Sequence, residues 1–276
     1  MAATVDSTSA ARPRPRRRRL AARYVVEWRL MAFRRLWRSS MLTSFLQPMM
    51  FVAGMGLGVG ALVNRNASSA ASLGGVKYIA FLAPGLLATT AMRVGGEESM
   101  WPVLGNFKWK GTFHAIVASP VQPSDIAIGQ ALFIALRCLL ATTTVSLALA
   151  LFPDTRSSGL LLAVPFSIVS GLAFGMPIVA FSATRERDSS FAAMSRFVIT
   201  PLFLFGGAFY PLKQLPRVLQ LVAELFPLWH GVELSRAATL HHLQFASVIE
   251  HLAYLAVWLV VGLLLTIHTF TKRLSV

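Results

Sequence analysis

Long runs of apolar residues, separated by short polar segments, dominate the pattern along the chain. A helix that crosses a bilayer needs about 20 consecutive apolar residues, and it satisfies its own backbone hydrogen bonds. Six runs approach this length, so the pattern predicts an all-α polytopic membrane protein. The six predicted membrane spans cover residues 42–63, 78–94, 126–152, 160–182, 191–210 and 248–270.

Two different segments precede the first predicted span. Residues 1–19 are rich in Ala, Ser, Thr, Pro and Arg, a composition typical of disorder. Residues 20–38 predict an interface helix at the level of the lipid headgroups, because charged residues form a narrow stripe at helical spacing among aromatic ones. The stripe consists of Arg23, Glu27, Arg34 and Arg38. We expect the interface helix and the six spans to form one transmembrane domain over residues 20–276.

The connection Trp101–Gln130 between the second and third predicted spans is too polar to cross a membrane. It contains Pro and Gly at several positions, and it is also rich in large apolar residues. A short segment with basic residues on one side and apolar residues on the other usually lies on a membrane surface or in a partner's groove. We therefore expect a short amphipathic helix that a soluble partner contacts.

The connection between residues 211 and 245 alternates apolar stretches with helix-breaking residues. Its apolar pieces are too short to span a bilayer, and they predict two short helices on either side of Pro227. Backbone at membrane depth persists only where protein or water satisfies its polar groups. We expect these helices to form a re-entrant hairpin that caps a cavity or pathway on the external side.

The composition agrees with a membrane protein, because 55% of residues are hydrophobic and 13% are charged, against about 25% charged in soluble domains. The net charge is +15, and eleven arginines lie between Arg12 and Arg38. Basic residues beside a first span hold that end in the cytoplasm. Six spans return the C-terminus to the same side, so we expect a multi-pass plasma-membrane protein with both termini cytoplasmic and no nucleic-acid partner.

Residue patterns of an enzyme site are missing from the sequence. It has no G-x-x-x-x-G-K-[ST] loop for a nucleotide, no metal-binding histidine spacing and no nucleophile elbow. Cys138 is the only cysteine, which excludes an intramolecular disulfide and a cysteine-based zinc site. We therefore predict no catalytic residue, no metal ligand and no cofactor bound by this chain.

Two other classes of function fit these patterns less well. A proton-coupled secondary carrier normally keeps a carboxylate near the membrane midplane, whereas carboxylates such as Glu97 and Glu98 lie at predicted span ends. A membrane-embedded enzyme would need a nucleophile and a base close together. Arg137 is a charge near the middle of a predicted span. It either contacts an anionic substrate headgroup or pairs with a neighbouring helix.

Several short motifs occur in an order that resembles one known family. They are Leu82-Ala83-Pro84-Gly85-Leu86, the stretch Thr112–Gln130, Gly207-Ala208-Phe209-Tyr210-Pro211-Leu212 with Leu215-Pro216, and Pro227-Leu228-Trp229-His230-Gly231-Val232 with Arg236. This order resembles the permease subunits of type-2 ABC exporters, in the branch of NodJ-like lipo-oligosaccharide, drug and polysaccharide exporters. The resemblance extends over nearly the whole chain from about Leu20.

The resemblance implies an ATP-driven exporter in which this chain is the membrane subunit. A second permease copy or paralogue would complete the pathway, and a separate ABC ATPase subunit would bind ATP and Mg²⁺. The interface helix and the loop after the second span would dock that ATPase. The substrate would be amphiphilic, such as a lipid-linked glycan, a lipo-oligosaccharide or a hydrophobic drug, moving outward among membrane lipids.

The residues expected to act in these two roles form two groups. The ATPase-docking group, with aromatic anchors in a partner groove and lysines at its rim, is Phe107, Lys108, Trp109, Lys110, Phe113, Ile116, Arg34 and Arg38. The substrate pathway and lid group is Pro84, Gly85, Arg137, Gly206, Gly207, Phe209, Tyr210, Pro211, His230 and Arg236.

Overall fold

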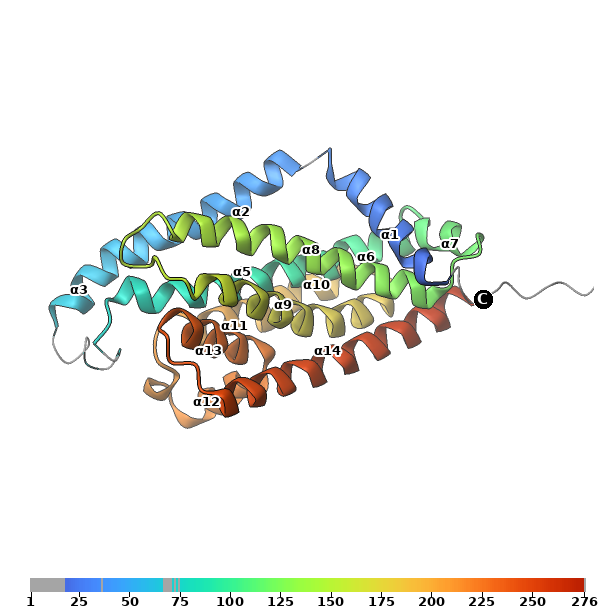
Figure 1. Ribbon diagram of the computed structural model, residues 1–276. Helices are drawn as coiled ribbons and strands as arrows, with labels where there is room; N and C mark the ends of the chain where they lie inside the picture. The colour runs from blue at the N-terminus through green and yellow to red at the C-terminus, as the bar shows by residue number, and fades with distance from the viewer. Residues whose placement is uncertain (1–17, 36, 67–70, 72, 74, 276) are drawn as a thin grey trace, which may run out of the picture.

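The structure is a computed structural model that describes residues 18–35, 37–66, 71, 73 and 75–275. Every regular element among these residues is a helix, and the helices form one elongated bundle (Figure 1). Most of the predicted disordered tail lies outside the described residues, and its last two positions begin the first helix. The all-α membrane fold predicted from the sequence is confirmed.

Five helices among the described residues are long and apolar enough to cross a membrane. They cover Phe45–Arg65, Tyr78–Phe107, Pro123–Leu149, Leu160–Ala183 and Phe245–Leu274. The first joins part of α2 (Trp37–Phe51), a π-helical stretch (Val52–Val59) and α3 (Gly60–Arg65). The second joins α5 (Tyr78–Ser99) and α6 (Trp101–Phe107), and the other three are α8, α9 and α14.

The second predicted span ended too early, because the helix continues past residue 94 to Phe107. The residues that follow the predicted end are Gly95-Gly96-Glu97-Glu98. In the fold, Gly171 of α9 lies so close to α5 that a Cβ on it would be 2.7 Å from the carbonyl oxygen of Ala91. Glu98 also finds charged partners, so the helix continues through residues that sequence rules place at its end.

The fifth predicted span, residues 191–210, is shorter than expected. A helix of 17 residues covers Ser189–Phe205 and is made of α10 (Ser189–Met194), a π-helical stretch (Ser195–Ile199) and α11 (Thr200–Phe205). At 1.5 Å per residue it is about 26 Å long, at the lower limit for a span. It ends at Gly206-Gly207, where Gly207 has a φ of +77° that favours glycine.

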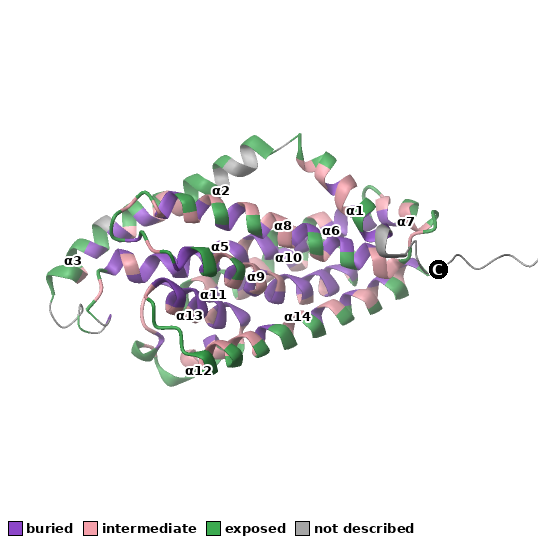
Figure 2. Ribbon diagram, viewed as in Figure 1, coloured by how far each residue is buried: buried purple, intermediate pink, exposed green. Residues whose placement is uncertain are grey.

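Helices α5 and α9 form the centre of the bundle, and α9 lies between α5 and α14. Along α5 nearly every residue between Tyr78 and Met92 is buried. Helix α14 instead has a buried face and a long exposed face (Figure 2). Its buried residues Leu255, Gly262 and Phe270 alternate with exposed valines and leucines at helical spacing. This exposed apolar face is what lipid would cover.

The predicted interface helix, residues 20–38, is interrupted. Helix α1 covers Arg18–Phe33 and packs along α8, and a turn then leads to α2. Packing of Val25 against Gly129 holds α1 in this direction, since a Cβ on Gly129 would be 2.6 Å from the Cβ of Val25. The turn contains no proline or glycine, so the break comes from tertiary packing and not from a local signal.

The connection after α11 forms the two short helices expected from the sequence. They are α12 (Arg217–Leu225) and α13 (Pro227–Thr239), and a single 3-10 turn (Leu212–Gln214) precedes them. Helix α13 is buried against α5, α9 and α14, whereas α12 exposes Val218 and Leu225. The predicted hairpin therefore exists, with one helix inside the bundle and the other on its surface.

Candidate functional site

The end of the bundle that carries α1, α7 (Thr112–Val117) and the C-terminus is held by a cluster of polar contacts around Glu186 (Figure 1). Lys108 Nζ donates to the Glu186 backbone oxygen at 2.8 Å and contacts its carboxylate at 3.2 Å. Arg273 Nη2 donates to the same carboxylate at 2.8 Å, and Arg273 Nη1 donates to the carbonyl oxygen of Ala183 at 2.6 Å. The cluster joins the end of α6, the loop after α9 and the end of α14.

Both basic partners act on the titration of Glu186, which lies on the surface outside the membrane-spanning helices. The hydrogen bond from Lys108, followed by the charge of Arg273, lowers the pKa of its carboxyl group below the ordinary value. A carboxylate with a lowered pKa in the folded state keeps its contacts above its ordinary pKa and loses them as the pH falls further. The Glu186 contacts are therefore fully formed at neutral pH. Neither Glu186 nor Arg273 belongs to the residues predicted from the sequence.

Three aromatic rings lie directly beneath this cluster. The ring centroids of Phe107 and Phe113 are 4.9 Å apart, those of Phe107 and Phe270 are 5.0 Å apart, and those of Phe113 and Phe270 are 5.4 Å apart. Phe113 is fully buried and Phe107 is 3% exposed. This corrects the predicted role of Phe107 and Phe113 as anchors in a partner groove, because both side chains already fill the core of this chain. They fix α7 to α14 instead.

The surface of the same segment carries the remaining members of the predicted docking group. Trp109 is 60% exposed and Lys110 is exposed, whereas Ile116 is half-buried against the core. Arg34 and Arg38 are exposed as well. They lie at the α1–α2 turn, away from α7 in Figure 1. The predicted docking residues therefore fall into three groups. One is exposed on the α6–α7 segment, one is exposed at the α1–α2 turn, and the third, the two phenylalanines, is buried.

Arg137 belongs to a buried cluster of charges and not to the lid. Its Nε donates to Glu98 at 2.9 Å, and Arg29 of α1 lies 3.5 Å from the other carboxylate oxygen. Arg137 also lies over the ring of Phe33, at 4.2 Å from the ring centroid, and Arg29 lies 4.4 Å from the centroid of Phe133. Of the two alternatives for Arg137, the structure shows pairing with a neighbouring helix.

These contacts connect α1, α5 and α8 through Glu98. Arg29 and Glu98 are not on the charged stripe or in a motif, so no sequence pattern pointed to them directly. The one hint was the position of Arg29 off the charged stripe. An arginine on the apolar side of an amphipathic helix needs a buried partner. Burial lowers the pKa of the Arg29 guanidinium, although the charge of Glu98 opposes this effect.

Most of the predicted lid residues do come together at the other end of the bundle. Arg236 donates to Glu233 at 2.6 Å and to the carbonyl oxygen of Gly207 at 2.7 Å, and it lies 3.9 Å from the ring centroid of Phe81. Gly85 of α5 lies so close to the chain after α11 that a Cβ on it would be 2.7 Å from the oxygen of Ala208. The chain after α11 therefore packs directly on α5. The other predicted residues here are the buried Pro84, Gly206 and Phe209 and the half-buried Tyr210 and Pro211.

His230 connects the two hairpin helices to α14. Its Nδ1 lies 2.7 Å from Nδ1 of His251, its Nε2 lies 3.0 Å from the backbone oxygen of Glu224, and its ring stacks on Tyr254. Burial lowers the pKa of His230 to about 4, so it is neutral at neutral pH. Among the described residues no group of three or more His, Cys, Asp or Glu side chains is arranged to hold a metal ion. The contacts of His230 therefore join α12, α13 and α14.

Long apolar helices, charges paired in the interior and a hairpin of short helices at one end define a multi-pass membrane protein. Residues 25–240 match the family described as ABC-2 type transporter. The chain therefore belongs to the ABC-2 type transporter family, whose members are membrane components of transporters.

Relatives in this family cover nearly the full length of the chain. Nodulation protein J of Rhizobium leguminosarum bv. trifolii is 29% identical over 253 residues, which is 91% of this chain and 94% of that protein. Nodulation protein J of Rhizobium meliloti (strain 1021) is 29% identical with the same coverage, and that of Neorhizobium galegae is 27% identical over 254 residues, again 91% and 94%. The predicted resemblance to NodJ-like type-2 ABC permeases is confirmed.

Proposed function

We propose that this chain is the membrane subunit of an ATP-driven exporter that moves an amphiphilic substrate outward across the plasma membrane. Membership of the ABC-2 type transporter family implies an ABC ATPase partner. The sequence contains no phosphate-binding loop of its own. ATP and Mg²⁺ would therefore bind to the partner, which would also carry out the hydrolysis.

The observation that carries this proposal is the connection between the α6–α7 segment and the ends of two long helices. Glu186 and the Phe107–Phe113–Phe270 cluster fix this segment to α9 and α14, while Trp109 and Lys110 remain exposed on it. A partner that presses on the exposed side would displace the segment together with both helices. Packed interfaces of this kind shift as units and do not deform continuously.

We propose Trp109 as the main anchor for the ATPase, with Lys110 at its rim. Large exposed aromatic residues dominate the free energy of small interfaces, whereas charges at the rim contribute mainly to the rate of association. Lys108 is engaged by Glu186 and is less available. Arg34 and Arg38 would form a separate contact, either with the ATPase or with anionic lipid headgroups.

Replacing Trp109 by alanine is expected to weaken ATPase binding by roughly 1–3 kcal/mol, because an anchor is removed and nothing in the permease core changes. Co-purification of the ATPase from detergent-solubilised membranes measures this effect, together with ATP-dependent uptake into inverted vesicles. Trp258→Ala, at a half-buried position on α14, is the matched control and should leave binding unchanged. Full binding and transport by Trp109→Ala would refute the assignment of this surface.

The proposed topology places the α1/α7 end in the cytoplasm and the hairpin outside. Single cysteines introduced as S158C, Q244C and S189C in a Cys138→Ala background test it, since all three serine or glutamine positions are exposed. We expect a membrane-impermeant maleimide to label S158C and Q244C in intact cells and S189C only after permeabilisation. The opposite labelling pattern would place the hairpin end in the cytoplasm and would contradict the proposed topology.

A second permease copy or paralogue and a substrate among lipid-linked glycans, lipo-oligosaccharides and hydrophobic drugs complete the proposal. A proton-coupled carrier is the alternative for which Glu98 would be the candidate site, since it is a carboxylate inside a long helix. Both of its oxygens are engaged by Arg137 and Arg29. This arrangement is that of a structural ion pair and gives the carrier no support.

A further inference from the structure

The turn that joins α1 to α2 gathers positive charge on the surface (Figure 1). Arg34 and Arg35 follow α1, and Arg38 follows Trp37, the first residue of α2. All four side chains are exposed, and we call these four residues the elbow. The sequence contains no acidic residue from position 28 to position 96. The elbow therefore has no carboxylate in its own segment.

A buried cluster next to the elbow also carries excess positive charge. Arg137 lies over the ring of Phe33, the last residue of α1, at 4.2 Å from the ring centroid. Arg137 and Arg29 share the carboxylate of Glu98, so this cluster combines two positive charges with one negative charge. The buried Nε and Nη2 atoms of Arg29 form no hydrogen bond with a described residue. An anion at the elbow would lower the free energy of this excess charge.

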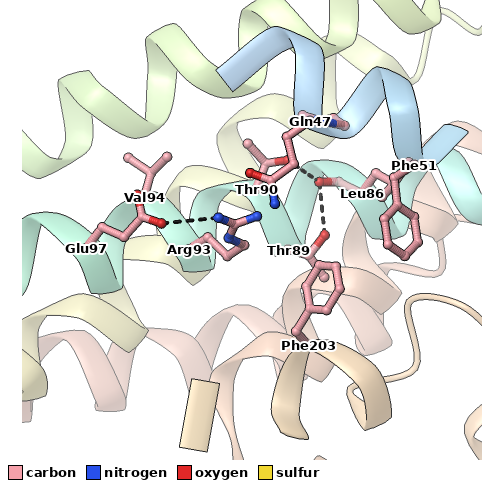
Figure 3. A pocket seen from close by; sticks show the side chains of 10 residues that line it. Gln47, Phe51, Leu86, Thr89, Thr90, Arg93, Val94, Glu97 and Phe203 are labelled. Carbon is pink, nitrogen blue, oxygen red and sulfur yellow. Dashed lines mark hydrogen bonds and ion pairs between the residues drawn. The ribbon is translucent and has the colours of Figure 1, made fainter. Parts of the chain in front are cut away.

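The charged residues on either side of the elbow are instead balanced within their own helices. Arg23 donates to Glu27 on α1 at 2.8 Å. Arg93 donates to Glu97 on α5 at 3.2 Å (Figure 3). This second pair lines a cavity between α2, α5 and α11, together with Phe51. The unbalanced positive charge therefore lies at the elbow and not in this cavity.

A stripe of exposed apolar side chains continues from the elbow along α2. Arg38 is followed at intervals of four residues by Leu42, Leu46 and Met50, all of them exposed. Residues four apart form a continuous row on a helix surface. Met50 lies about 18 Å along the helix axis from Arg38, which is slightly more than half of a hydrocarbon core of about 30 Å. A charged end and an apolar row of this length match one leaflet of a bilayer.

We propose that the elbow and this stripe bind an anionic phospholipid of the cytoplasmic leaflet, with the phosphate beside the arginines and one acyl chain along α2. The choice of leaflet rests on the proposed topology. The apolar span begins at Phe45, about two helical turns after Arg38, so the elbow lies at the depth of the headgroups. Arg38 lies over Trp37 at 5.8 Å from the ring centroid, and tryptophan is enriched at this depth. Clustered arginines beside a span attract anionic lipids.

Two protein partners fit this surface less well. The exposed surface of α7 is separate from the elbow in Figure 1, and a soluble ATPase would leave the apolar stripe within the span uncovered. A second copy of the chain, packed symmetrically on this face, would bring the elbow arginines of both copies together. Like charges at an interface oppose association.

Lipid binding to the purified full-length chain in dodecyl maltoside tests the proposal without an ATPase. The probes are radiolabelled dioleoylphosphatidylglycerol, which is anionic, and dioleoylphosphatidylcholine, which has the same acyl chains and no net charge. We expect the wild-type chain to bind phosphatidylglycerol at least tenfold more tightly. This preference should decrease at about 0.5 M NaCl, where salt screens exposed charges. The triple variant Arg34→Gln, Arg35→Gln, Arg38→Gln should raise the Kd for phosphatidylglycerol by roughly tenfold or more.

The matched control removes the same charge from the opposite end of the bundle. It is the triple variant Arg65→Gln, Lys213→Gln, Arg217→Gln, at three exposed positions. The control should bind phosphatidylglycerol like the wild type, and both triple variants should elute as one symmetrical peak in size-exclusion chromatography. Replacing Leu46 by asparagine should weaken the binding of both lipids alike, because it changes only the contact with the acyl chain.

Equal affinity of the wild-type chain for the two lipids would overturn the recognition of charge. Unchanged phosphatidylglycerol binding by the elbow variant would overturn the site, and a simultaneous loss of ATPase co-purification would assign the elbow to the ATPase. Displacement of phosphatidylglycerol by equimolar inorganic phosphate would overturn the choice of a lipid. Inverted cysteine labelling would overturn the choice of leaflet together with the proposed topology. Loss of export with normal lipid binding would count against the proposed function alone.

Discussion

Replacing Glu98 by glutamine should destabilise the folded protein by about 3–5 kcal/mol, because it leaves the buried Arg29 and the largely buried Arg137 without their shared carboxylate. Arg29 and Arg137 come from α1 and α8, so the loss should loosen α1 from the bundle. The fraction of monodisperse protein that survives heating in mild detergent, followed by size-exclusion chromatography, measures this effect. Proteolysis within α1 should become faster in the same variant.

Glu97→Gln is a control at the neighbouring position. Its ion pair with Arg93 is largely exposed, and such pairs contribute roughly 0–1 kcal/mol. A double variant, Arg29→Gln with Glu98→Gln, should lose less than the sum of the two single losses, since the partners share one cluster. Equal stability of Glu98→Gln and Glu97→Gln would show that the buried cluster does not hold α1.

Replacing Phe113 by alanine should also cost about 3–5 kcal/mol of stability, because the side chain is fully buried and its removal leaves a cavity. The loss should separate α7 from α14, since Phe113 contacts both Phe107 and Phe270. The same thermal assay measures it. Phe113→Leu, which keeps most of the volume, should lose far less.

Trp109→Ala gives the contrasting result in this assay. Its side chain is exposed, so stability should change by about 0.5 kcal/mol or less, while ATPase binding decreases. Phe113→Ala should lower ATPase binding only to the extent that α7 loses its position, and stabilising lipid should restore part of it. If the Phe113→Ala protein has normal stability but reduced ATPase binding, Phe113 is a surface anchor for the ATPase and not a core residue.

The hydrophobic pattern was sufficient to predict the class of fold, the hairpin and the interior location of Arg137. The hydrophobic pattern failed as a guide where the same local pattern suits two different environments of the side chains. The aromatic residues of the α6–α7 segment suit a partner groove as well as the core of their own chain, and periodicity cannot distinguish the two. Phe107 and Phe113 turned inward because Phe270, more than 150 residues away in the sequence, completes the cluster.

The sequence by itself determined that this chain crosses a membrane several times, since its apolar runs leave no alternative way to satisfy the backbone in lipid. Its motifs also determined the ABC-2 type transporter family. Only the tertiary structure decided where α5 ends, that α1 stops at Phe33 and which carboxylate Arg137 meets. It also decided that Arg93 and Glu97 share a cavity with Phe51 and Phe203. These features depend on contacts between helices distant in sequence. A charge in an apolar run does not reveal which residue it will pair with, and a glycine does not reveal which helix will pack against it.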